Sequence, residues 1–202
     1  MPQSRSGTRF PTGDLARVAV FAALIAALGL PGSVNVFGGG VPITLQTFGV
    51  MLAGTILGSW RSALAVGVLI VLVAAGLPLL AGGRGGLAVF AAPTAGFLLG
   101  WLPGAAVTGL LVEKGGRTPS TVRLLVACLT GGIGVIYLVG VPFWAAVSGL
   151  TLAQAALQSL VFLPGDLAKA VLAALVARGT QRAYPDAVPA VHRERLHAGR
   201  ED

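Results

Sequence analysis

Two oppositely charged residues, Asp166 and Lys169, stand three positions apart in the otherwise apolar run FLPGDLAKAVLAALVA, residues 162–177. Residues at positions i and i+3 share one face of a helix. A single charge at the centre of a membrane helix costs about 2.5–3.5 kcal/mol on insertion scales, so both charges need compensation. One interpretation is an ion pair that only neutralises itself and lets the helix insert. The other is a pair that also binds a polar ligand in a protein-lined cavity.

The residues just before the pair favour the ligand-binding interpretation. Pro164, which Gly165 follows, has no amide proton and leaves a carbonyl group one turn earlier without its helical partner. Irregular backbone at membrane depth is tolerated where it is buried in protein or lines a cavity. We therefore expect an interrupted helix here, with a cavity beside Asp166 and Lys169.

A second candidate cation lies in the glycine loop AGGRGG, residues 81–86. Arg84 is either a solvated loop residue or a ligand-binding group beside glycines such as Gly83, whose backbone can approach a ligand closely. A guanidinium group can form a bidentate pair with a carboxylate. The functional interpretation places Arg84 on the face where a ligand enters, and both interpretations stay open at this point.

Uncharged polar residues mark two further positions. Thr44, Gln46 and Thr47 lie where an uncharged loop becomes a helix, so their side chains either cap that helix or orient a ligand. Tyr137 lies in an otherwise apolar run, where a tyrosine either packs with one hydrogen bond or contacts a ligand. The candidate substrate-binding residues are therefore Asp166, Lys169, Arg84, Gln46, Thr44, Gly83 and Tyr137.

No pattern in the sequence predicts an enzyme. Both histidines, His192 and His197, fall in the polar tail, so no histidine base or metal cluster is expected among the apolar segments. The loop AGGRGG lacks the context of a phosphate-binding loop. The single cysteine, Cys128, lies in an apolar run and excludes an intrachain disulfide. We expect no catalytic residue, no metal site and no cofactor, so active transport would draw its energy from a partner or an ion gradient.

The composition is that of an integral membrane protein. Of the 202 residues, 55% are hydrophobic and 10% are charged, and the mean hydropathy is +0.85. Soluble domains carry about 25% charged residues. The net charge of +7 comes from scattered basic residues that flank apolar runs, which indicates membrane topology rather than nucleic-acid binding. The N-terminus lacks the pattern of a cleaved signal peptide, so the first apolar run is expected to remain as a span.

Six apolar runs predict an all-α integral membrane protein, a bundle of six transmembrane helices in the lipid bilayer. Asp14 is expected to cap the first helix, and the segment PFWAAVSG, residues 142–149, is expected to form a turn. Residues 1–180 should form one substrate-binding domain, with a polar, disordered cytoplasmic tail over 181–202. The expected helices cover residues 15–30, 45–59, 63–80, 94–112, 121–141 and 151–178.

The distribution of basic residues predicts the orientation in the membrane. Of the 14 Lys and Arg residues, only Arg84 falls on the second side, and Lys169 lies within the sixth expected helix. In membrane proteins the cytoplasmic loops carry the excess of basic residues. Both termini are therefore expected in the cytoplasm, and Arg84 is expected on the outer side of the cytoplasmic membrane. The 12 residues on the first side are Arg5, Arg9, Arg17, Arg61, Lys114, Arg117, Arg123, Arg178, Arg182, Arg193, Arg195 and Arg200.

Three motifs in this order resemble a known family. The segments VPITLQTFGVMLAG, GLPLLAGGRGGLAVFAAPTAGFLLGW and FLPGDLAKA are similar to those of BioY, the biotin-specific substrate-binding (S) component of energy-coupling factor (ECF) transporters. The resemblance covers the chain from about Asp14 to Arg178. Where the family more often reads GPTGG, this chain has APTAG, residues 92–96, a departure that bears on local packing only.

The resemblance implies a six-helix bundle that binds biotin near its extracytoplasmic side. It implies a membrane coupling subunit driven by two cytoplasmic ATPases, so ATP would be used by the partners alone. It also implies small residues four apart on the first helix that dock the coupling subunit, a pattern that Ala19, Ala23 and Ala27 fit, as do Ala22 and Ala26. Ordinary packing inside the bundle is the alternative for these alanines.

The resemblance also suggests roles for the charged residues. Asp166 would accept from the ureido N–H groups of biotin, Lys169 would donate to the ureido oxygen or the carboxylate, and Arg84 would bind the carboxylate. Three other functions stay open. The chain could be an S component for another small vitamin, a stand-alone carrier with Asp166 and Lys169 as a proton relay, or an accessory subunit without a ligand.

Overall fold

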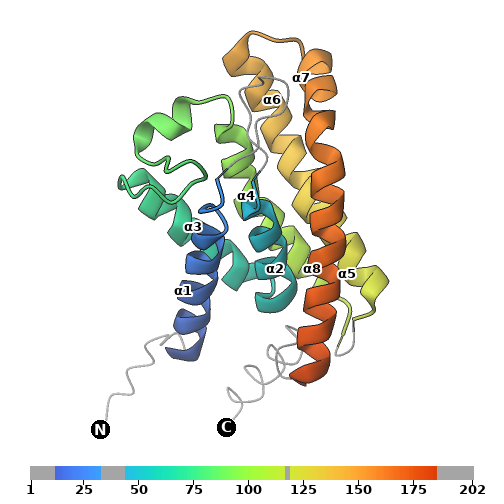
Figure 1. The fold of residues 1–202 in the computed structure, drawn as a ribbon. Coiled ribbons are helices and arrows are strands. Elements are labelled where there is room, and N and C mark those ends of the chain that lie inside the picture. The colour runs from blue at the N-terminus through green and yellow to red at the C-terminus, as the bar shows by residue number, and fades with distance from the viewer. Residues whose placement is uncertain (1–11, 33–43, 117–118, 186–202) are drawn as a thin grey trace, which may run out of the picture.

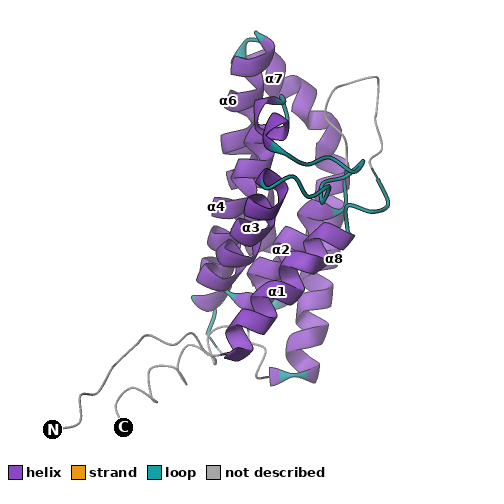
Figure 2. Cartoon of the chain, turned by 90° about the vertical axis from the view of Figure 1, so that its left-hand side faces the viewer, coloured by secondary structure: helices purple, strands orange, loops and turns teal. Residues whose placement is uncertain are grey.

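A computed structural model describes residues 12–32, 44–116 and 119–185. Every regular element in these ranges is a helix, as Figure 2 shows, and an isolated bridge between Leu80 and Arg84 is the one strand-like pairing. The all-α prediction is confirmed. The elements are α1 (Thr12–Ala27), α2 (Gln46–Leu57), α3 (Ser59–Ala74), η1 (Leu87–Ala91), α4 (Ala95–Glu113), α5 (Thr121–Ala127), η2 (Cys128–Val135), α6 (Ile136–Ser148), α7 (Leu152–Ser159), η3 (Leu160–Phe162) and α8 (Leu163–Ala183).

Apart from the short 3₁₀ helix η1, these elements form six helical segments, because α5, η2 and α6 run on as one long helix and so do α7, η3 and α8 (Figure 1). Three segments are long and apolar enough to cross a membrane, namely Ala95–Glu113, Thr121–Ser148 and Leu152–Ala183. The shorter helices α1, α2 and α3 have 16, 12 and 16 residues, below the ~20 that span a bilayer. The six-helix bundle that the sequence predicts is present, with unequal helices.

Glycines let the helices approach one another closely. A methyl group added at Gly54 of α2 would lie 2.7 Å from Cβ of Thr108 in α4, and one added at Gly104 of α4 would lie 2.7 Å from a side-chain carbon of Ile136. Larger residues at these positions would push α2, α4 and α6 apart. Close packing through small residues is how helices associate where the hydrophobic effect does not drive them together.

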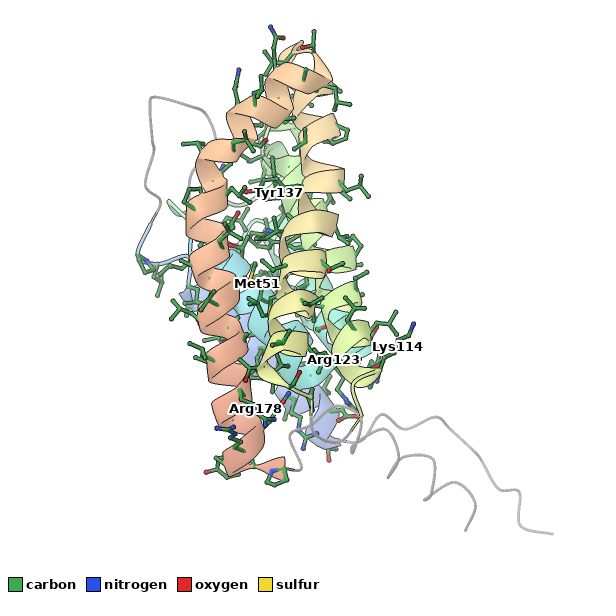
Figure 3. The ribbon with its side chains drawn as sticks, turned by 90° about the vertical axis from the view of Figure 1, so that its right-hand side faces the viewer. Met51, Lys114, Arg123, Tyr137 and Arg178 are labelled. Atoms are coloured by element: carbon green, nitrogen blue, oxygen red, sulfur yellow. The ribbon has the colours of Figure 1, made fainter. Side chains whose placement is uncertain are left out.

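The described ends of the chain lie at the same end of the bundle. Thr12 begins α1 and Ala183 ends α8 at the lower end in Figure 1. Figure 3 shows Lys114, Arg123 and Arg178 near this end as well, so the basic residues gather there as the topology prediction requires. That this end faces the cytoplasm stays a prediction.

A buried ion pair joins α1 to α3 at this basic end. Asp14 Oδ1 lies 2.9 Å from Arg61 Nε, and the two residues are 2% and 4% exposed. Arg61 also donates to the carbonyl of Leu57 at 3.3 Å. The prediction that Asp14 caps the first helix is wrong, because α1 begins at Thr12 and places Asp14 within its first turn, facing Arg61.

Several helix ends differ from those expected; the third helix, for example, ends at Ala74 rather than at residue 80. The turn predicted over residues 142–149 is wrong, because α6 continues through Pro142 to Ser148 and ends at Gly149, whose φ is +65°. Neighbouring helices can satisfy the backbone groups that a proline frees in a membrane helix. The third helix begins at Ser59 rather than at residue 63, directly after Gly58, because glycine can adopt the positive φ of 81° that separates α2 from α3.

Some expectations lie outside the described residues. The loop expected before Thr44 falls mostly in residues 33–43, and the tail expected from residue 181 falls mostly in residues 186–202. Both histidines are in that second range. Within the described part, α8 continues beyond Arg178 as far as Ala183.

Candidate small-molecule site

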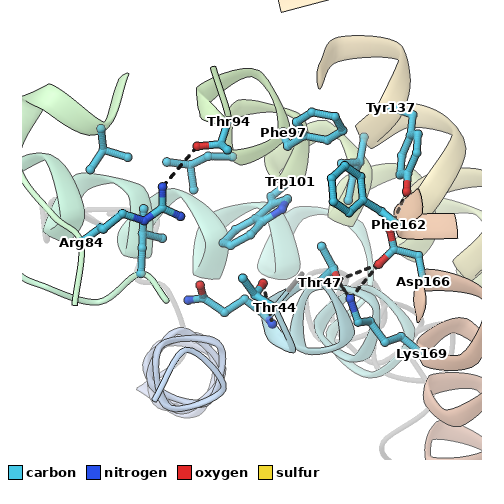
Figure 4. Close-up of a pocket in the computed structure, with 15 residues that line it drawn as sticks. Thr44, Thr47, Arg84, Thr94, Phe97, Trp101, Tyr137, Phe162, Asp166 and Lys169 are labelled. Atoms are coloured by element: carbon cyan, nitrogen blue, oxygen red, sulfur yellow. Dashed lines mark hydrogen bonds and ion pairs between the residues drawn. The ribbon is translucent and has the colours of Figure 1, made fainter. Parts of the chain in front are cut away.

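A cavity opens between α2, α4, α6, α8 and the segment that joins α3 to α4 (Figure 4). The empty space in it is about 690 Å³, a volume that includes open solvent at its mouth. It lies away from the basic end, since Tyr137 stands far from Arg123 and Arg178 in Figure 3. The residues that line it are Thr44, Gln46, Thr47, Leu80, Arg84, Val89, Thr94, Phe97, Leu98, Trp101, Ile136, Tyr137, Phe162, Asp166 and Lys169.

At one side of the cavity the Asp166–Lys169 pair forms the centre of a hydrogen-bonded cluster. Lys169 Nζ lies 2.8 Å from Asp166 Oδ1 and donates to Thr47 Oγ1 at 3.1 Å. The Thr47 hydroxyl donates to Asp166 Oδ1 at 3.3 Å, and the Tyr137 hydroxyl donates to Asp166 Oδ2 at 2.8 Å. Asp166 and Lys169 are each 6% exposed. Three helices thus compensate the charges that the sequence places in an apolar segment.

The chain interrupts its last long helix just before this cluster, as the proline predicts. The 3₁₀ turn Leu160–Phe162 separates α7 from α8, and Pro164 stands in the first turn of α8. A proline is tolerated there because the first amides of a helix have no intrahelical acceptor. Asp166 consequently falls in the first turn of α8, where the helix dipole favours a carboxylate.

Arg84 reaches the same cavity from the glycine loop. Its Nε donates to the carbonyl of Ala81 at 3.1 Å, and its Nη1 donates to Thr94 Oγ1 at 3.4 Å. The turn that carries it needs Gly82 and Gly83, whose φ angles are +77° and +71°. The guanidinium group is therefore held against the lining of the cavity rather than extended into solvent. Gly83 shapes this turn and does not line the cavity.

Gln46 holds the glycine loop in place. Its amide nitrogen donates to the carbonyls of Ile25 at 3.1 Å and Leu79 at 3.0 Å, and its amide oxygen accepts from the Ala81 N–H at 3.1 Å. Gln46 is 1% exposed, so its side chain ties α1 and the loop to the start of α2. Thr44 Oγ1 accepts a hydrogen bond from the Gln46 N–H at 3.3 Å, although the N-cap residue of α2 is Leu45, which has no side-chain cap.

An aromatic wall joins the two polar sides of the cavity. Phe97 packs edge-on against Tyr137, with ring centroids 5.6 Å apart, and lies 6.5 Å from Phe162. Trp101, one helical turn after Phe97 in α4, stands between Arg84 and the Asp166 cluster in Figure 4. Sequence reasoning missed Phe97, Trp101 and Phe162. The one signal for Phe97 and Trp101 is their i, i+4 spacing in α4, which buried packing produces equally well, and no such spacing marks Phe162.

The alanines of α1 divide into two faces. Ala19, Ala23 and Ala27 are exposed, whereas Ala22 is buried and Ala26 is half-buried. Only the second set faces the interior of the bundle. The three exposed alanines form a smooth outer strip, which is available for contact with lipid or with another protein.

The fold and the site define a multi-pass integral membrane protein with a cavity lined by charged and aromatic side chains. A model of the BioY family matches residues 2–186. The biotin transporter BioY of Rhizobium etli is 49% identical over 179 residues, which cover 86% of this chain and 96% of that protein. The biotin transporter BioY of Rhodobacter capsulatus is 48% identical over 180 residues, covering 85% and 94%.

A solved structure agrees with these sequence matches. The crystal structure of the S component for biotin from an ECF-type ABC transporter superposes with a TM-score of 0.80 at 32% identity, covering 85% of this chain and 92% of that chain. The chain belongs to the BioY family, as its three motifs suggest. Its relatives are named as transporters, which agrees with the prediction that it is not an enzyme and lies in the cell membrane.

Proposed function

We propose that this chain binds biotin in the cavity and delivers it across the cytoplasmic membrane as the S component of an ECF-type transporter. The observation that carries the proposal is the cavity itself, with the Asp166–Lys169 pair at one side, Arg84 at another and an aromatic wall between them. The two relatives and the solved structure described above carry names that refer to biotin.

The unused hydrogen-bonding capacity of the charged pair fits a cyclic urea. An ionised carboxylate offers about four acceptor positions and an ammonium group three donors. Asp166 accepts three hydrogen bonds and Lys169 donates two, both within the cluster. One acceptor position and one N–H therefore remain for a ligand. The ureido ring of biotin presents an N–H beside a C=O, which would take up both.

The rest of the cavity suits the remaining parts of biotin. Arg84 is the proposed partner of the valerate carboxylate, because a guanidinium group binds a carboxylate in a bidentate, charge-assisted manner. Phe97, Trp101 and Phe162 would enclose the fused ring. Gln46 and Gly83 would act indirectly by holding the loop of Arg84, and Thr44 by holding Gln46, with Tyr137 orienting Asp166.

We further propose that ATP hydrolysis takes place on partner subunits. The chain has no phosphate-binding loop, and the alternative energy source, a proton relay, would need Asp166 to change protonation between two strong donors, Lys169 and Tyr137. A coupling subunit in the membrane would dock on the exposed alanines of α1, with two cytoplasmic ATPases beneath it. The chain itself needs no resident cofactor or metal in this scheme.

Calorimetric titration of biotin into the purified chain in detergent tests the proposal. We expect saturable binding at one site per chain, with no displacement by excess riboflavin or thiamine. A site built to hydrogen-bond the ureido group rejects ligands that leave its polar atoms unpaired. Binding of another vitamin in place of biotin would assign a different substrate, and no binding of any vitamin would favour an accessory subunit.

A further inference from the structure

One polar group in the lining of the cavity is left without a partner. Trp101 is 6% exposed, and its indole Nε1 is buried with no hydrogen bond. Among the cavity-lining residues in the described part of the chain, no other buried side-chain nitrogen or oxygen lacks one. A buried tryptophan usually finds an acceptor for its N–H, because leaving a desolvated donor unpaired is unfavourable. The acceptor is therefore expected from the ligand.

The position of Trp101 limits which part of a ligand can supply that acceptor. Figure 4 shows the indole between Arg84 on one side and the Asp166–Lys169 pair on the other. Both of those groups are charged and match the two polar ends of an elongated ligand. A group that meets Trp101 must belong to the middle of the molecule, where an aromatic wall otherwise surrounds it.

This inference rests on the proposed function, because biotin has one acceptor between its polar ends. The thioether sulfur lies in the fused ring, next to the carbon that carries the valerate chain. We propose that Trp101 is a specificity-determining residue whose Nε1–H donates to the thioether sulfur of biotin. A thioether is a weak acceptor, so the contact selects between closely related ligands rather than supplying most of the affinity.

The pair biotin and dethiobiotin tests the contact, because dethiobiotin keeps the ureido group and the carboxylate but has no sulfur. In Trp101→Phe, which keeps an aromatic ring but removes the N–H, we expect the preference for biotin over dethiobiotin to fall about threefold to tenfold. Titration calorimetry on the full chain measures both affinities. Trp144→Phe is the matched control: Trp144 is 7% exposed, packs 6.3 Å from Phe97 and does not line the cavity, so the preference should stay unchanged.

Two results would overturn the inference while leaving the proposed function intact. Equal losses of affinity for both ligands would mean that Trp101 serves packing or a group that the two ligands share. Unchanged affinity for both would mean that the N–H meets no ligand atom. Failure of the unmodified chain to bind biotin at all would instead remove the proposed function, and the inference with it.

A spectroscopic measurement keeps the test independent of how well Trp101→Phe folds. The chain has three tryptophans, so the indole ¹⁵N–H signal of Trp101 can be assigned by loss of the other two signals in Trp60→Phe and Trp144→Phe. We expect the Trp101 indole proton to shift downfield with biotin and to remain closer to its free position with dethiobiotin. The same shift with both ligands would contradict a contact to sulfur.

Discussion

At the scale of single residues, the two cationic side chains of the cavity are held in different ways. Lys169 is fixed by an aspartate and a hydroxyl on two helices, whereas Arg84 is fixed by a backbone carbonyl and Thr94. The charge of Lys169 is balanced within the protein, but no ion pair involving Arg84 is found in the described residues. Arg84 is therefore the better candidate for an anionic group of the ligand.

Removing Arg84 should discriminate between a charged and an uncharged ligand. Arg84→Ala is expected to weaken biotin binding roughly tenfold or more, because charge-assisted hydrogen bonds contribute about 1.5–3 kcal/mol. Biotin amide, which lacks the carboxylate, should lose much less. Parallel titrations of both ligands give the comparison, and equal losses would show that Arg84 does not bind the carboxylate.

At the scale of helices, sequence reasoning recovered six segments, the residues of the charged cluster and the interruption near Pro164, but it expected a turn from Pro142 that the structure does not show. Helix α6 continues through Pro142 without a break, whereas a 3₁₀ turn interrupts the last long helix just before Pro164. The two differ in what packs around them, and a sequence read alone does not contain those neighbours. Gln46 illustrates the same limit, because its three backbone partners lie 21, 33 and 35 residues away.

The buried ion pair between α1 and α3 should matter for stability and not for the ligand. Asp14→Asn leaves Arg61 buried without its counter-charge, and losing one partner of a buried pair typically costs about 3–5 kcal/mol. We expect a clearly lower Tm in detergent, and a partial return in Asp14→Asn combined with Arg61→Met. A single variant as stable as the parent would show that the pair contributes little.

The outer strip of α1 should serve partner docking. Ala23→Trp is expected to reduce uptake in cells that express the whole transporter at least about tenfold, while biotin binding to the isolated chain stays within about threefold, because Ala23 points away from the bundle. Ala156→Trp, at an exposed alanine of α7 at the other end of the molecule, is the matched control and should leave uptake unchanged. Joint loss of binding and uptake in Ala23→Trp would indicate internal packing instead.

At the scale of the whole molecule, the distribution of basic residues predicts the orientation in the membrane. The cavity lies away from the basic end, so a cytoplasmic basic end would place the site toward the outside. In a Cys128→Ala background, Ala153→Cys in α7 should react with a membrane-impermeant maleimide in intact cells. Lys114→Cys at the basic end should react only after permeabilisation. Labelling of both from the same side would refute the topology.

Asp166 and Lys169 are proposed to bind the ligand rather than only neutralise each other, and the double variant Asp166→Asn with Lys169→Met separates these two roles. Removing both charges avoids the penalty of leaving one of them buried alone. We expect a folded protein that binds biotin at least about tenfold more weakly than the parent, since even one charged hydrogen bond contributes about 1.5–3 kcal/mol. A folded double variant with unchanged affinity for biotin in the same calorimetric titration would show that the pair only neutralises itself and does not bind the ligand.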